Sequence, residues 1–153
     1  MAELYKALDI AKWFVAWADD EEADLSNLKL QKLLYYAQGW HLGLRSRPLF
    51  SDEIQAWSHG PVVPSVYHQF KDCGSSDIRL VNVGHFSWDE VDSETAQFLV
   101  TVWNTYGEYG AWRLRNMTHA EPPWRDHFHE DSRFIQIPND ELEKYFKSRA
   151  SKN

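Results

Sequence analysis

The sequence predicts a mainly α-helical fold, α+β at most, with five to seven helices and a small β element. Three observations predict it. Apolar residues recur at intervals of three and four along several segments, as they do on one face of a helix. Extended stretches are short and confined to residues 53–57, 78–83 and 134–137. The 153 residues contain no repeat or low-complexity tract, which indicates one domain over residues 1–153.

The first two helices are expected over residues 4–18 and from residue 27 to about 45. An acidic connector, residues 19–24, separates them. Ser26 suits the N-cap of the second helix, and Gly39 and Gly43 should let another helix, such as the first, pack closely against it. The apolar stripe of the second helix has one polar member, a histidine that we expect to be buried and hydrogen-bonded. The stripe consists of Leu30, Leu33, Leu34, Ala37, His41 and Leu44.

The middle of the chain is expected to hold an extended segment, a turn and a third helix. Residues 49–57 mix apolar and polar side chains, and His59-Gly60-Pro61 forms a turn because Gly tolerates unusual dihedrals and Pro fixes its own. Pro64 suits the first turn of a helix that ends near residue 72. The alternating residues 78–83 are the best strand candidate of the chain.

The remaining elements are three helices and one more extended segment. Asp92 or Ser93 caps a fourth helix, a fifth covers residues 111–117, and residues 124–129 add one or two helical turns. Thr118 and Glu121 have the spacing of a capping box for that last segment. Residues 134–137 alternate, and Pro138 opens the final helix. We expect the core to span residues 4–146 and the polar tail, residues 147–153, to fray.

Composition limits the classes of function. The net charge is −7 and the aromatic content is 15 %, so the acidic balance argues against direct nucleic-acid binding. The abundance of large rings favours a protein interface. Cys73 is the single cysteine, which suits a reducing compartment. Neither a signal peptide nor an apolar run of about 18 residues is present, so we expect a cytoplasmic protein without a membrane contact.

Three pieces of the sequence resemble one family. They are residues 30–40 (LQKLLYYAQGW), residues 53–67 with Ala56-Trp57 and HGPVVPSVY, and Leu114 with Thr118-His119-Ala120-Glu121 followed by Pro123-Trp124. Their content, order and spacing are similar to those of the Panacea, or SocA-like, antitoxin domain. The resemblance covers the chain from the first helix to about residue 130.

The resemblance implies an antitoxin encoded beside its toxin in bacteria and prophages. Such a protein neutralises a cognate protein toxin by direct contact. Some relatives instead act as adaptors that deliver the toxin to an ATP-dependent protease, and this remains the alternative. The family has no shared catalytic set to carry over, so the resemblance implies a binding role, no enzyme activity and no cofactor.

Candidate partner contacts follow from residue type, because Trp, Tyr and Arg are the usual interface hot spots and a rigid loop binds at low entropy cost. The partner-contact candidates are Tyr35, Trp40, Arg45, Arg47, Trp57, His59, Pro61, Tyr67 and Trp124. The structural signature residues are Gly60, Pro64, Thr118, His119 and Glu121.

A catalytic reading is the second alternative. A small hydrolase or metal enzyme would use His59, His119 and Glu121. However, the chain contains no HExxH, paired CxxC, nucleophile elbow or phosphate-binding glycine loop. We therefore expect no catalytic residue and no metal site.

Overall fold

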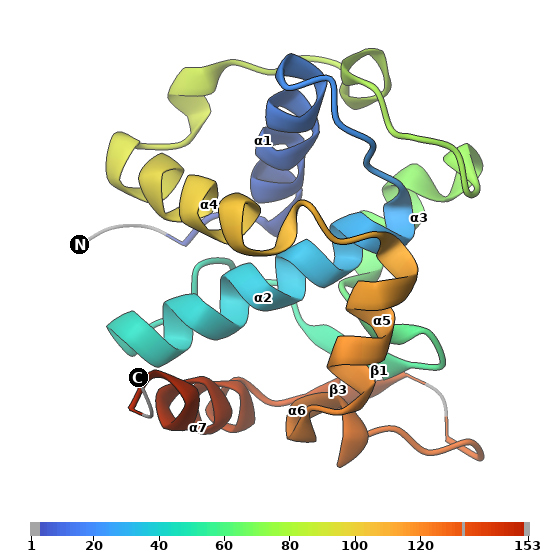
Figure 1. The fold of residues 1–153 in the computed structure, drawn as a ribbon, viewed down its shortest axis with the longest axis vertical. Coiled ribbons are helices and arrows are strands. Elements are labelled where there is room, and N and C mark those ends of the chain that lie inside the picture. The colour runs from blue at the N-terminus through green and yellow to red at the C-terminus, as the bar shows by residue number, and fades with distance from the viewer. Residues whose placement is uncertain (1–3, 133, 152–153) are drawn as a thin grey trace.

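A central helix, α2 (Asn27–Arg45), organises the fold. The computed structural model describes residues 4–132 and 134–151. Within them, α2 packs against α1 (Ala7–Asp20), α3 (Pro64–Phe70), α4 (Ser93–Tyr106), α5 (Ala111–His119) and α7 (Asn139–Ala150) (Figure 1). A short helix, α6 (Pro122–Arg125), precedes the last strand. The prediction of a mainly helical fold is confirmed.

The ends of α1 and α2 follow from local hydrogen bonds. The α1 helix begins at Ala7, because the Asp52 carboxylate accepts the Ala7 amide at 2.8 Å while Tyr5 pairs with Phe50 in a bridge outside the helix. It therefore starts three residues later than expected and continues to Asp20, into the acidic connector. Ser26 caps α2 as predicted, accepting the Lys29 amide at 3.3 Å.

The sheet is small and antiparallel, with the strand order β2-β1-β3. Its strands are β1 (Ile54–Trp57), β2 (Gly60–Val62) and β3 (Ile135–Ile137). Ser58 and His59 form the tight connection of the β1–β2 hairpin, in which Trp57 faces Gly60. The extended segments expected near residues 53–57 and 134–137 are thus confirmed.

The prediction of a strand at residues 78–83 is wrong. Residues Leu80–Val83 form a turn of 3₁₀ helix instead. The Asn82 side chain accepts the Arg79 amide at 2.8 Å, which closes the turn. Val81 is 87 % exposed, so the alternation of the sequence does not correspond to one buried and one exposed face.

Helices α3 to α6 lie near their expected positions. The α3 helix starts at Pro64 and ends at Phe70, and a 3₁₀ turn follows it. Asp92 caps α4, accepting the Thr95 amide at 2.8 Å. The helical segment expected over residues 124–129 is only the short α6.

The last helix corrects two expectations. Lys147 does not begin a frayed tail, because α7 continues to Ala150 and Lys147 pairs with Glu143 at 2.9 Å; residues 152–153 lie outside the described residues. Gly39 and Gly43 accommodate α7 and not α1. A Cβ atom at Gly39 would lie 2.1 Å from the Phe146 ring, so the glycine is what lets α7 cross α2. None of the described helices has the length and apolar character needed to cross a bilayer.

Candidate functional site

Two buried glutamines of α2, both within residues 30–40, bind backbone groups of the chain that follows the helix. The Gln31 side chain accepts the Val63 amide at 2.9 Å. The Gln38 side chain accepts the amides of Leu49 and Phe50 at 2.8 and 3.1 Å. Both glutamines are fully buried, so each satisfies backbone groups of the chain that follows α2. Their role is to fix that chain on the helix.

Lys32 performs the same task beneath the His-Gly-Pro turn. Its side chain is fully buried and its Nζ donates to the Pro61 carbonyl at 3.1 Å. Burial, and then the charge of Arg115, lowers the pKa of Lys32 to about 7. Gly60 has φ +109°, and a Cβ there would lie 2.5 Å from Lys32 Cε and 3.0 Å from Thr118 Oγ1. The turn is therefore packed directly onto α2 and α5, and Pro61 is buried rather than offered to a partner.

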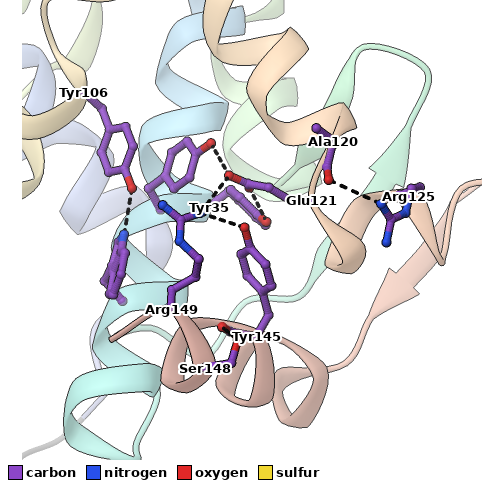
Figure 2. Close-up of polar contacts among 10 residues, drawn as sticks. Tyr35, Tyr106, Ala120, Glu121, Arg125, Tyr145, Ser148 and Arg149 are labelled. Carbon is purple, nitrogen blue, oxygen red and sulfur yellow. Dashed lines mark hydrogen bonds and ion pairs between the residues drawn. The ribbon is translucent and has the colours of Figure 1, made fainter. Parts of the chain in front are cut away.

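Glu121 accepts two tyrosine hydroxyls in the interior. Tyr35 and Tyr36 each donate to its carboxylate at 2.9 Å, and the Arg149 guanidinium lies 4.0 Å away (Figure 2). Burial raises the pKa of Glu121, and the two tyrosine hydrogen bonds oppose that rise. Figure 2 shows Tyr145 and Arg149 reaching from α7 toward the carboxylate. This network joins α2, α6 and α7. Because Tyr35 belongs to it and is buried, Tyr35 cannot contact a partner.

The prediction of a capping box between Thr118 and Glu121 is wrong. Thr118 belongs to α5, where its hydroxyl donates to the Arg115 carbonyl at 2.7 Å. Glu121 is itself the N-cap of α6, and its side chain makes no capping hydrogen bond. The tyrosines of α2 take the carboxylate, because two hydroxyl donors in a buried site satisfy it better than one amide would.

His119 and Trp124 fasten α6 to the β1–β2 hairpin. Their rings stack at 3.7 Å, and the Trp124 indole N–H donates to the Trp57 carbonyl at 2.7 Å. Burial, followed by the charges of Arg115 and Lys32, lowers the pKa of His119 to about 4. The imidazole is therefore neutral at pH 7. Trp124 is 8 % exposed, which removes it from the surface available to a partner.

Three of the predicted contacts lie together on the surface. Trp57 and Tyr67 are half-buried, with ring centroids 5.1 Å apart, and His59 is exposed beside them. Trp57, His59 and Tyr67 line a pocket of about 310 Å³. The hairpin and the start of α3 bring these side chains together, although they are up to ten positions apart in the sequence.

Sequence reasoning missed two residues of the same surface, Trp112 and Arg115. Trp112 is 58 % exposed. The Arg115 guanidinium lies 4.4 Å from the Trp112 ring, and its Nε donates to His59 Nδ1 at 3.4 Å. Their spacing of three residues on a helix was the available signal. We call Trp57, His59, Tyr67, Trp112 and Arg115 the signature face.

Three other candidates lie near the opposite end of α2. Trp40 donates to the Tyr106 hydroxyl at 2.8 Å, and Arg45 lies 3.6 Å from Glu94. Arg47 is exposed, and its carbonyl bonds His41 at 2.7 Å, which confirms His41 as a buried, hydrogen-bonded histidine. A groove of about 470 Å³ between α2 and α4 includes Trp40 and Arg45. At 1.5 Å per residue, this end of α2 is about 25 Å from its start, so the two surfaces are separate.

Each residue of the catalytic alternative has its own contact within the protein. Glu121 is engaged by tyrosines, His119 stacks on Trp124, and His59 bonds Arg115 on the surface. Within residues 4–132 and 134–151, no group of three or more His, Cys, Asp or Glu side chains is placed to hold a metal ion.

Known proteins are similar to this chain over most of the helices and strands described above. The family described as "Antitoxin SocA-like, Panacea domain" matches residues 30–125. Antitoxin SocA from Caulobacter vibrioides (strain NA1000 / CB15N) is 35 % identical over 109 residues, which cover 65 % of this chain. The matched part is 58 % of that relative's own length. No solved structure matches.

Proposed function

This chain belongs to the SocA-like Panacea antitoxin family, and from that premise we propose that it is an antitoxin that neutralises a cognate protein toxin by binding it directly. The family match over residues 30–125 carries the proposal. That range extends from α2 to α6 and includes the whole signature face.

The geometry supports a binding role for the signature face. Its side chains are exposed or half-buried, while the interior beneath them is fixed by Lys32, Gln31 and Glu121. A surface that is already rigid loses little conformational entropy on binding, and Trp, Tyr and Arg are the residues that most often supply interface energy. An interface of ordinary size would bury roughly 1,200–2,000 Å² in total.

The mechanism we propose is occlusion. The antitoxin covers the working surface of the toxin, inhibition follows affinity, and no turnover by this chain is needed. We place the complex in the cytoplasm. Three of the nine original contact candidates, Tyr35, Pro61 and Trp124, are excluded from the proposed interface because they are buried.

Co-expression tests the proposal. This chain is produced together with the product of the adjacent reading frame, growth is scored, and the complex is purified from cells lacking the major ATP-dependent proteases. Rescue of growth with a stable complex in those cells supports occlusion. Rescue that disappears without the proteases assigns the adaptor role instead, and a toxic neighbour that this chain neither binds nor neutralises overturns the proposal.

A further inference from the structure

We propose that the toxin docks an acidic segment on the signature face, with a carboxylate received beside the Arg115 guanidinium and the His59 ring. This inference rests on the proposed function and adds the chemistry of the partner. The net charge of −7 would by itself favour a basic partner. The local arrangement of charges on this face instead favours an acidic segment of the partner.

Arg115 is held in place before any partner arrives. Its guanidinium lies 4.4 Å from the Trp112 ring, its Nε donates to His59 Nδ1 at 3.4 Å, and its Nη1 donates to Asn116 at 3.0 Å. Because Nδ1 of His59 is the acceptor, the ring carries its hydrogen on Nε2. Among the described residues, Arg115 Nη2 and His59 Nε2 have no hydrogen-bond partner, so two donors are free for a carboxylate.

The described part of the chain does not neutralise the positive charge at this place. The ion pairs found among residues 4–132 and 134–151 use other cationic side chains, and none includes Arg115. Lys32 lies fully buried within reach of the Arg115 charge, and its amine donates to the Pro61 carbonyl at 3.1 Å. An uncompensated cationic spot on an acidic protein selects for an acidic surface on the partner.

The adjoining pocket defines the rest of the segment. His59 belongs both to the Arg115 contact and to the pocket of about 310 Å³, whose walls include Leu28, Trp57, Val62 and Tyr67. Lys71 also lines it, and none of its described lining residues is Asp or Glu. The site therefore suits a segment in which an acidic residue is followed or preceded by an apolar side chain. Figure 1 shows α5 beside the β1–β2 hairpin, and α5 packs against β2. The Arg115 contact and the pocket share His59, so the two parts adjoin.

Charge reversal on one helix tests the inference. Arg115→Glu and Arg113→Glu change the net charge equally, but residues two apart on a helix do not share a face. Arg113 instead lies over Tyr109, at 4.3 Å. Binding to the purified product of the adjacent reading frame is measured by calorimetry for both variants and for the unchanged chain. We expect Arg115→Glu to weaken binding at least about tenfold and Arg113→Glu to leave it within about twofold.

The outcomes separate this inference from the proposed function. If the unchanged chain does not bind a toxic neighbour, the proposed function fails and the inference with it. If the unchanged chain binds and Arg115→Glu binds equally well, only the inference fails. An equal loss for both variants also overturns it, because the effect is then one of net charge alone.

A second measurement serves if Arg115→Glu does not fold. The photoreactive residue p-benzoylphenylalanine replaces Trp112, whose side chain is 58 % exposed, and crosslinks to the toxin are mapped by mass spectrometry. Crosslinks within a toxin segment that contains Asp or Glu support the proposal. Crosslinks confined to segments without an acidic residue, or no crosslink in a complex that forms, contradict it.

Discussion

Replacing Lys32 by methionine should change how the stability of the protein depends on pH. The side chain is fully buried, and among the described residues its amine has one hydrogen-bond acceptor, the Pro61 carbonyl at 3.1 Å. Burial is the main reason that its pKa falls from the usual 10.5 to about 7. At about 1.4 kcal/mol per pKa unit, protonating this amine costs the folded protein about 5 kcal/mol more than the unfolded chain.

The sign of the effect follows from proton binding. Between pH 7 and 10.5 the unfolded chain holds the Lys32 proton more firmly than the folded protein does, so stability rises with pH across that window. Below about pH 7 both states are protonated and the dependence vanishes. Integration over the titration gives a gain of about 2 kcal/mol between pH 7 and pH 9.

Urea unfolding at pH 7, 8 and 9 measures this gain. The unchanged protein is compared with Lys32→Met and with a matched control, Lys144→Met, in which an exposed lysine is replaced. Between pH 7 and pH 9, the free energy of unfolding of the Lys144→Met control should rise by about 2 kcal/mol more than that of Lys32→Met. Equal pH dependence in the unchanged protein and Lys32→Met would show that Lys32 does not bind its proton differently in the folded and unfolded states.

Two further predictions concern the contacts that join α7 and α6 to α2. Gly39→Ala should lower the free energy of unfolding by about 1–3 kcal/mol, because the new methyl group would overlap the Phe146 ring. The control in thermal melts is Gly110→Ala, where the added methyl group has no described atom within 4 Å. Equal melting temperatures for the two variants would contradict the packing of α7 on Gly39. Glu121→Ala leaves two buried tyrosine hydroxyls without their acceptor and should lower the free energy of unfolding by about 2–5 kcal/mol. Glu121→Gln keeps an acceptor and should lower it less. A larger loss of stability for the glutamine variant in denaturant titrations would contradict this role of Glu121.

Local signals in the sequence predicted much of the helical framework. Ser26 and Asp92 cap α2 and α4 as expected, because a cap depends only on a few neighbouring residues. Residues 78–83 show the limit of such signals. Alternation predicts a strand only if another strand pairs with it, and Asn82 closes a local turn instead.

The surface could not be predicted with the same success, because burial depends on what surrounds a helix. Within the described residues, α2 packs against α1, α3, α4, α5 and α7, so Tyr35 and even Lys32 are buried. A single amphipathic stripe gives no indication of this. Trp112 is exposed although its residue type favours burial, which only the placement of α5 decides.

Hydrogen–deuterium exchange of this chain with and without its bound toxin shows which surface the toxin covers. We expect protection on binding to concentrate on the hairpin around Trp57 and His59 and on α5 around Arg115. The distant groove between α2 and α4, around Trp40 and Arg45, should exchange as it does in the free protein. Protection confined to that groove would show that the signature face is not the toxin-binding surface.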